Sequence, residues 1–412
     1  MLLTFSVQNY KGIGERQELN FIASTKNEFP KTLYEVNESL KVNGGLCLVG
    51  ANGVGKSHLL QSLRFFHSFI ARGENLNMLE TFLLSDKWNG KPTEFEALYY
   101  CDALKEFLSY DLTLLNGKVV SENLVSRKNR KGSKNKVVFE REGNTVKLGR
   151  DIKVSEEMIS ATIDSGASLI KFSSGINIPQ LKSVHKIANA TLLFTPDLVQ
   201  DLGHALVSEL VGGSRLNAAE NEEEKETLLI SCNKRLKICK DIINAFDVPI
   251  NKIELVDFDN GKYEIFITPE RIGDNGFKFS LEQAQGFYST GTFNLIIMTM
   301  LIMGMSTFGH ILLLDEIDGS FHHRLTLAII DLMRTASDEK MSQFIISTHD
   351  IMVIDHSFRR DAILTVTKDK NLETVVSRMS DYSVRKDAKL SMKYLSNEFG
   401  NLPKIMRKNF DE

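Results

Sequence analysis

The chain has 412 residues, with 50 basic and 53 acidic side chains, and this near balance argues against a protein that coats nucleic acid. Its longest apolar run, residues 295–305, is too short to span a bilayer, and its N-terminus lacks the pattern of a signal peptide. The four cysteines lack metal-ligand spacing and are expected to be reduced thiols. These features favour a cytoplasmic protein without a membrane segment, long enough for two or three domains.

A phosphate-binding motif follows an apolar strand pattern near the N-terminus. Residues 46–49 are apolar, residues 50–57 fit G-x-x-x-x-G-K-[ST], and a helical pattern opens at His58. Such a loop points successive backbone N–H groups at phosphate oxygens, with the positive end of a helix dipole behind them. We expect the Ser57 hydroxyl to bind Mg²⁺. The residues expected to hold the nucleotide are Gly50, Asn52, Gly53, Gly55, Lys56 and Ser57.

The long middle of the chain must contain insertions rather than one loop. Residues 94–148 alternate in a way that predicts antiparallel strands, residues 155–245 are dominated by helical signals, and strand patterns return over 252–268. Residues 126–136 carry six positive charges and no acidic residue. They would either contact nucleic-acid phosphates or form a solvated hairpin turn, and the absence of interleaved aromatic residues favours the hairpin.

A second phosphate-binding surface is predicted further along. Residues 286–294 contain a Ser-x-Gly turn, Ser289 to Gly291, which leads into the apolar helix expected over 295–305. The turn would present a hydroxyl and helix N–H groups, but it brings no lysine of its own.

Two short apolar strands follow, and each ends in polar residues. The strand over 311–314 ends in Asp315 and Glu316. Because ligands collect at the carboxyl ends of strands in α/β sheets, we expect Asp315 to bind the Mg²⁺ shell and Glu316 to be the general base for an attacking water. The strand over 343–348 ends at His349, which would touch the γ-phosphate and the water. A lone histidine at a strand end can also be structural.

The order of these motifs resembles the ABC-type ATPase heads of SMC, RecF and OLD-like proteins. Within that class the chain is similar to a bacterial family of stand-alone AAA/ABC-type ATPases found in anti-phage defence modules, on residues 1–11 and 360–403. The resemblance implies an α/β fold: a P-loop ATPase head with a mixed sheet core, an antiparallel β lobe and an inserted helical arm. It places an N-terminal ATPase lobe at 1–154, the helical arm at 155–250 and a C-terminal ATPase lobe at 251–412.

The resemblance also implies a head-to-tail homodimer or a higher homo-oligomer. Ser289 and Gly291 would then reach the γ-phosphate of ATP on the partner, and Asp318 of the D-loop would cross the interface. The D-loop, residues 318–323, lacks the proline usual in the family.

The implied activity is hydrolysis of ATP, with Mg²⁺, to ADP and phosphate. In the resembled family such an ATPase senses infection and controls a separate effector encoded nearby, such as a nuclease. One alternative is a RecF- or SMC-like repair ATPase whose partner is DNA. Another is a binding module in which ATP is structural, and Glu316 and His349 count against it.

Overall fold

The computed structural model describes most of the chain and separates it into two compact units. One unit comprises Met1–Leu193, His310–Asp315 and Gln343–Glu412, and the other comprises Phe194–Gly309 and Glu316–Ser342. The predicted boundaries at 154 and 250 stay a prediction. The described residues are 1–24, 32–74, 76, 79–150, 152, 154–195, 207, 216, 219, 221–257, 263–270, 277–308, 311–319, 321–337, 341–356, 358–382 and 389–399.

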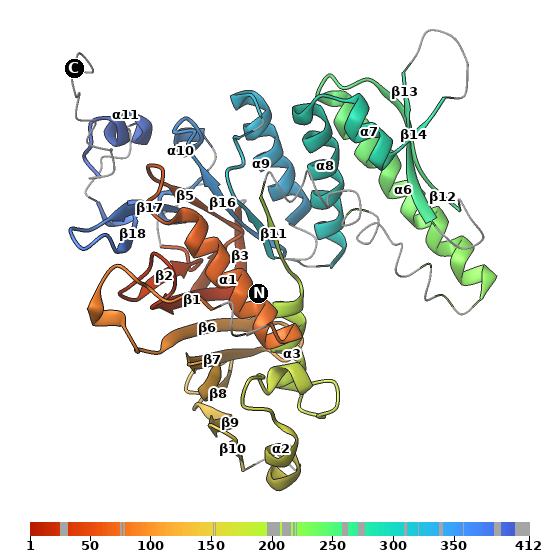
Figure 1. Ribbon diagram of the computed structural model, residues 1–412. Helices are drawn as coiled ribbons and strands as arrows, with labels where there is room; N and C mark the ends of the chain where they lie inside the picture. The colour runs from red at the N-terminus through yellow and green to blue at the C-terminus, as the bar shows by residue number, and fades with distance from the viewer. Residues whose placement is uncertain are drawn as a thin grey trace. The chain divides into compact units, whose positions relative to one another are not determined.

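A six-stranded sheet in the first unit carries the phosphate-binding loop at its centre (Figure 1). The four inner strands pair in parallel, and the edge strand β18 pairs antiparallel with β17. Every residue of β5, β15 and β16 is buried, which explains why these strands are continuous apolar runs rather than alternating ones. The predictions of these three strands are confirmed. In sheet order the strands are β11 (Thr191–Phe194), β15 (Ile311–Leu314), β16 (Gln343–Thr348), β5 (Gly45–Val49), β17 (Ile363–Lys368) and β18 (Thr374–Arg378).

The second sheet of this unit is seven-stranded, and each pair of neighbouring strands in it is antiparallel. Its strands confirm the antiparallel pattern predicted over 94–148, and β7 alternates buried with half-buried residues along most of its length. The basic run 126–136 spans the end of β8, a connecting loop and the start of β9, so it does form a hairpin. In sheet order the strands are β10 (Thr145–Leu148), β9 (Lys136–Glu142), β8 (Lys118–Lys128), β7 (Glu106–Leu115), β6 (Thr93–Cys101), β1 (Leu2–Gln8) and β2 (Gln17–Asn20).

Helix α1 (Lys56–Arg72) packs its apolar face on the seven-stranded sheet. The Phe66 ring lies 5.5 Å from the ring of Phe5 on β1 and 5.3 Å from that of Phe95 on β6. Among the residues that α1 buries are five large apolar side chains at helical spacing, which is the pattern of a helix with one face in the core. Those five are Leu59, Leu63, Phe66, Phe69 and Ile70.

The remaining elements of the first unit are short. In the described residues, β3 (Leu33–Asn37) and β4 (Leu40–Asn43) form a hairpin. The helices are α2 (Glu156–Thr162), α3 (Pro179–Asn189), α10 (Val353–His356) and α11 (Leu390–Leu395). Turns of 3₁₀ helix lie at Asp86–Trp88, Ile170–Phe172, Arg360–Ala362 and Met379–Asp381.

Gln343 joins the two sheets of this unit. Its side-chain oxygen accepts the backbone N–H of Leu2 at 2.7 Å, and its side-chain nitrogen donates to the Leu2 carbonyl at 2.8 Å. Gln343 is buried on β16 and Leu2 is buried on β1. One amide side chain therefore satisfies both backbone groups of Leu2 and ties β1 to the sheet that carries the phosphate-binding loop.

The second unit combines helices with a small three-stranded sheet (Figure 1). Helix α6 packs on strand β12 and on helix α8, and its first turn carries three glutamates that favour the positive end of its dipole. The strands predicted over 252–268 and the apolar helix predicted over 295–305 are confirmed. Its elements are α6 (Glu222–Ala245), β12 (Ile250–Asp257), β13 (Tyr263–Pro269), β14 (Phe279–Ser280), α7 (Leu281–Phe287), α8 (Thr290–Phe308) and α9 (His323–Ser337).

Helical structure is confirmed at α2, α3 and most of α6 within the range 155–245, although most of 196–220 lies outside the described residues. None of the helices in the described part of the chain is long and apolar enough to cross a membrane.

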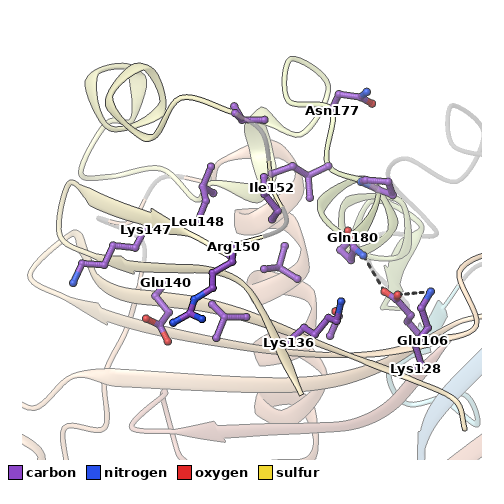
Figure 2. A pocket seen from close by; sticks show the side chains of 17 residues that line it. Glu106, Lys128, Lys136, Glu140, Lys147, Leu148, Arg150, Ile152, Asn177 and Gln180 are labelled. Atoms are coloured by element: carbon purple, nitrogen blue, oxygen red, sulfur yellow. Dashed lines mark hydrogen bonds and ion pairs between the residues drawn. The ribbon is translucent and has the colours of Figure 1, made fainter. Parts of the chain in front are cut away.

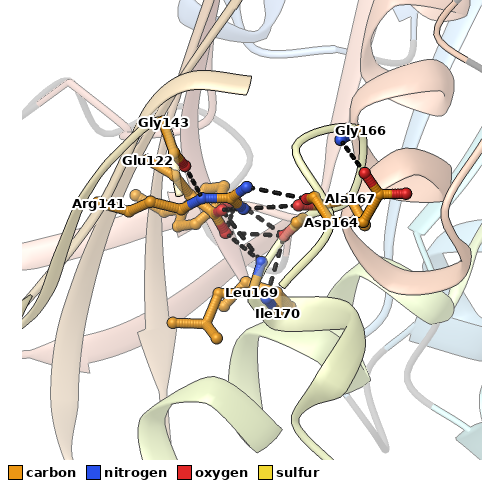
Figure 3. A network of polar contacts seen from close by, with 10 residues as sticks. Glu122, Arg141, Gly143, Asp164, Gly166, Ala167, Leu169 and Ile170 are labelled. Atoms are coloured by element: carbon orange, nitrogen blue, oxygen red, sulfur yellow. Dashed lines mark hydrogen bonds and ion pairs between the residues drawn. The ribbon is translucent and has the colours of Figure 1, made fainter. Parts of the chain in front are cut away.

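A buried ion pair holds a loop against the seven-stranded sheet (Figure 3). Arg141 on β9 and Glu122 on β8 are both completely buried, with 3.0 Å between their charged atoms. Arg141 also donates to the carbonyls of Ala167 at 2.6 Å and Asp164 at 3.0 Å. Glu122 accepts from the Leu169 N–H at 2.9 Å. The pair therefore binds the segment that runs from Asp164 to Leu169, and each charge is satisfied by several hydrogen bonds.

Replacing Arg141 with alanine should lower the free energy of unfolding by about 3–5 kcal/mol, because it leaves the Glu122 carboxylate buried without a counter-charge. The double variant Glu122→Gln with Arg141→Met should lose less, since neither remaining side chain carries a charge. Urea unfolding followed by circular dichroism measures both. Equal losses in the single and double variants would show that the charge is not what matters here.

His67 is a buried histidine held neutral by its surroundings. Its Nδ1 lies 2.7 Å from the hydroxyl of Thr191 and its Nε2 lies 2.8 Å from the hydroxyl of Tyr99, so it links α1 to β11 and β6. Burial lowers the pKa of His67 from 6.5 to about 3, with a smaller contribution from the nearby Arg64 cation. The folded protein therefore disfavours the protonated ring, whereas the unfolded chain binds that proton near pH 6.5.

The stability that His67 contributes should be complete above about pH 6.5 and should decline as the pH falls toward 3, by about 1.4 kcal/mol per pH unit. Between pH 7 and pH 5 the wild-type protein should lose about 2 kcal/mol more than the His67→Gln variant, which cannot ionise. Urea unfolding of both proteins at the two pH values checks this. An identical pH dependence in the two proteins would contradict it.

Candidate phosphate-binding site

The loop between β5 and α1 has a backbone that requires glycine at two positions. A Cβ atom on Gly50 would lie 2.3 Å from the carbonyl oxygen of Val366 on β17. A Cβ on Gly55 would lie 2.2 Å from the Thr374 hydroxyl, and Gly55 also has a φ of +108°. Both glycines therefore allow the loop to curl closely against the β17–β18 hairpin, which is the backbone shape that a phosphate cradle needs.

Lys56 and the first turn of α1 complete the loop. The N-terminus of α1 has no side-chain cap, because its N-cap residue is Gly55. Backbone N–H groups are thus left for an anion, with the positive end of a 17-residue helix behind them. Lys56 is buried, and its Nζ donates to the carbonyls of Gly50 at 2.9 Å and Ala51 at 3.0 Å, so it bridges the mouth of the loop. Ser57, half-buried, is the next residue of the helix.

The strand register brings Asp315 and His349 to the same sheet edge as the loop. Val49, the last residue of β5, pairs with Thr348, the last residue of β16, so Gly50 and His349 leave neighbouring strands at the same level. On the other side of β16, Leu314 pairs with Ile346, which sets Asp315 beside Ser347. The loop, Asp315 and His349 thus gather at the carboxyl ends of parallel strands, as predicted.

Ser347 holds the Asp315 carboxylate, a role that was not predicted. Its hydroxyl donates to Asp315 Oδ1 at 2.5 Å, and both residues are buried. A hydroxyl that holds one oxygen of a carboxylate also fixes the direction of the other oxygen. Residues that hydrogen-bond to metal ligands orient those ligands in the same way. Ser347 lies inside the strand over 343–348, for which the sequence predicted a role only at His349, the residue that follows the strand. Only the pairing of β15 with β16 reveals the contact.

Thr374 is a second supporting residue that was missed. Its hydroxyl donates to the Val54 carbonyl inside the loop at 2.9 Å, and its backbone N–H donates to the Gly12 carbonyl at 2.9 Å. Gly12 in turn donates its N–H to His58 Nδ1 at 3.1 Å, directly after the loop. Burial lowers the pKa of His58, and the Lys11 and Lys368 cations lower it further, so the ring is suited to accept this bond.

Glu316 begins the second of the two stretches that form the second unit, and its backbone is left-handed. It is exposed between the buried residues Asp315 and Ile317, and its φ is +51°. A non-glycine residue in this left-handed region costs on the order of 1–3 kcal/mol and is found most often at functional sites. The Glu316 carbonyl accepts the Gly319 N–H at 2.9 Å, which closes a tight turn that leads into Asp318.

The Ser-x-Gly segment begins helix α8 within the second unit. The Ser289 hydroxyl accepts the Thr292 N–H at 3.2 Å and lies 2.9 Å from the Thr292 hydroxyl, so Ser289 caps the helix. Ser289 is exposed and Gly291 is half-buried in the first turn. Ser320 of the D-loop lies outside the described residues.

The residues present fit a nucleotide with Mg²⁺. Phosphate oxygens would be held by the loop N–H groups and Lys56, and Mg²⁺ by the Ser57 hydroxyl and Asp315, with phosphate and water oxygens as the other ligands. Such a site needs few protein ligands. Accordingly, it is compatible with the finding that no group of three or more His, Cys, Asp or Glu side chains in the described ranges could hold a metal ion.

Comparisons with known proteins give only distant likenesses. No protein-family model and no curated protein matches the chain. Similar solved structures include an SMC head bound to the C-winged helix domain of ScpA, at 13% identity over 92% of this chain and 98% of that one, with a TM-score of 0.48. The SMC head domain of Thermotoga maritima matches at 13% identity over 92% and 98%, with a TM-score of 0.41. An SMC head with a coiled coil and joint derived from Pyrococcus yayanosii matches at 12% identity over 97% and 99%, with a TM-score of 0.44. The interpretation of the site rests on its own contacts.

Replacing Ser347 with alanine should weaken Mg²⁺-dependent ATP binding roughly 10- to 100-fold, because Asp315 loses the hydroxyl that orients it. Binding in excess EDTA should stay unchanged, since the loop and Lys56 are untouched. Titration calorimetry with ATP at several Mg²⁺ concentrations separates the two terms. An equal loss with and without Mg²⁺ would mean that Ser347 supports the sheet rather than the metal ligand.

Proposed function

We propose that this chain is an ATPase that binds ATP with Mg²⁺ on the loop between β5 and α1. The observation that carries the proposal is the close packing of the loop on the β17–β18 hairpin. It admits no side chain at Gly50 or Gly55 and leaves the uncapped N-terminus of α1 facing the curl. Glycine requirements of this kind support a phosphate cradle better than an ordinary turn, because a solvent-exposed turn tolerates a Cβ.

Hydrolysis is supported by the residues at the ends of β15 and β16. When bound, Mg²⁺ would neutralise charge on the phosphates. Asp315, oriented by Ser347, would be its protein ligand. Glu316, which is exposed and has a left-handed backbone, would accept a proton from the attacking water. His349 would contact the γ-phosphate from the neighbouring strand end.

We further propose that two copies close head-to-tail around ATP. Ser289 and Gly291 would bind the γ-phosphate held by the partner copy, and Asp318 would cross the interface. The support is local: the first turn of α8 carries no acidic residue, so no carboxylate opposes an anion at the positive end of its dipole. Release of phosphate would remove the charge that joins the copies and turn hydrolysis into opening and closing.

The opening and closing would control a separate effector protein in the cytoplasm, such as a nuclease in an anti-phage defence module. This part of the proposal rests on the resemblance of motif order.

The variant Glu316→Gln should bind ATP as tightly as the wild type but hydrolyse it about 10²–10⁴-fold more slowly, since the general base is lost. It should form a dimer in ATP that the wild type forms only transiently. Phosphate release and light scattering after gel filtration measure these properties. Glu223→Gln, an exposed glutamate of α6 with the same charge change, is the matched control.

Lys56→Ala should bind no ATP and form no such dimer, which separates binding from hydrolysis. Purifying Glu316→Gln in ATP together with the products of neighbouring genes tests the effector. A stoichiometric protein partner supports the gating role, and wild-type hydrolysis by Glu316→Gln would overturn the assignment of the base.

A further inference from the structure

A basic hollow lies at the far end of the seven-stranded sheet, away from the phosphate-binding loop in sequence (Figure 2). It has a volume of about 1230 Å³. Residues from four places along the chain line it: Glu106 on β7, the β8–β9 hairpin, the described residues 147–150, 152 and 154, and residues 177–180 at the start of α3. The hollow therefore exists only in the folded unit, and none of its residues has a role in the proposed nucleotide site.

Four cations line the hollow against two carboxylates. The cations are Lys128, Lys136, Lys147 and Arg150. Glu106 is buried and already engaged, by Lys128 at 2.8 Å and by the Gln180 side chain at 3.0 Å. The other carboxylate, Glu140, pairs across the strands with Lys147. The described lining thus carries four basic and two acidic side chains on a chain whose net charge is −3.

The connecting loop of the hairpin adds to this excess at the rim. Residues 129–135 contain Arg130, Lys131 and Lys134 and no carboxylate. Lys131 and Lys134 are exposed. The sequence pattern alone favours a solvated turn, but folding adds Lys147 and Arg150 from another segment beside it. A positive surface of this size is the electrostatic footprint of a polyanion.

The cations follow one side of the hollow in a row. Figure 2 shows Lys147, Arg150, Lys136 and Lys128 in turn along one wall, with Glu140 between Lys147 and Arg150 and with Ile152 and Asn177 across from them. Ser126 pairs with Lys136 and Glu140 pairs with Lys147, which sets these residues beside one another on neighbouring strands, and a register shift between Leu124 and Val125 separates the two pairs.

The rest of the lining is aliphatic. Its members are Val137, Val138, Leu148, Ile152, Val154 and Ile178. None of the described lining residues is aromatic. A row of charge beside an apolar surface fits a ligand that carries an anion and a flat apolar group at every repeat. A nucleic-acid strand has both for any sequence, whereas an extended peptide turns alternate side chains to opposite sides.

We propose that the basic hollow binds a short stretch of single-stranded nucleic acid, with backbone phosphates on Lys136, Lys147 and Arg150 and bases against the aliphatic lining. A nucleic-acid duplex cannot present its bases to this lining, because the bases are stacked and paired inside the duplex. The proposal does not depend on ATP hydrolysis and goes beyond the effector-gating role.

The test is fluorescence anisotropy of the full chain with labelled oligodeoxythymidine, oligouridine and a duplex of matched length. The double variant Lys147→Ala with Arg150→Ala should bind the preferred single strand about tenfold more weakly at ~0.15 M salt, which is physiological ionic strength. The slope of log affinity against log salt should flatten by roughly 1.4, or ~0.7 per lost phosphate contact. ATP hydrolysis should be unchanged.

The double variant Lys91→Ala with Lys118→Ala removes the same charge from two exposed lysines outside the hollow and is the control. A loss confined to the hollow variant supports the site, and the two single-strand arms identify DNA or RNA as the ligand. Equal losses in both variants, duplex bound as tightly as single strand, or displacement by polyglutamate of equal length would each overturn the proposal. The last result would make an acidic peptide the ligand.

Discussion

Parallel pairing of four buried strands is the constraint on which the site depends. β5 lies between β16 and β17, and the register sets Val49 level with Thr348 on one side and Thr365 on the other. Parallel strands end at the same edge of the sheet. The residues that follow them therefore meet there, although they lie far apart in the sequence. The Val366 carbonyl then lies so close to Gly50 that the loop must begin with a residue lacking a side chain. Displacing β17 by one residue would remove this steric requirement and the support that the hairpin gives the loop.

Two groups of buried polar side chains in the first unit each satisfy several partners at once. Arg141 and Glu122 form an ion pair and also bind backbone groups between Asp164 and Leu169. Gln343 satisfies both backbone groups of Leu2. A buried charge or amide costs several kcal/mol when it is unpaired, so each set defines one arrangement of the elements around it. The two sets act on opposite parts of the seven-stranded sheet. One fixes the outer strands and their loop, and the other fixes β1 to the strand that holds Ser347.

Sequence periodicity predicted the strands that position the site, and the roles of the residues at their ends stay predictions. The apolar runs at 46–49, 311–314 and 343–348 predicted three buried strands, and a glycine loop and two carboxylates at their ends predicted the chemistry. Ser347 and Thr374 could not be assigned in the same way, because their roles arise from strand pairing between segments far apart in the chain. The left-handed backbone of Glu316 has no sequence signal either, since glycine or asparagine is the usual marker of that conformation. The hollow could not be predicted either, because only the pairing of β9 with β10 brings Lys147 and Arg150 beside the β8–β9 hairpin.

The two anion-binding surfaces proposed for the first unit differ in their physics. The loop offers backbone N–H groups and a buried lysine, whose charge is little screened by salt, whereas the hollow offers exposed side chains whose attraction falls steeply with ionic strength. They are connected through ordered structure: the hollow strands pair on to β1, and Leu2 of β1 bonds to Gln343 on the strand that ends beside the loop. A connection of this kind is not yet a coupling. If nucleic acid changes the affinity for ATP by some factor, ATP must change the affinity for nucleic acid by the same factor, and each ligand must then prefer one of two arrangements of these sheets.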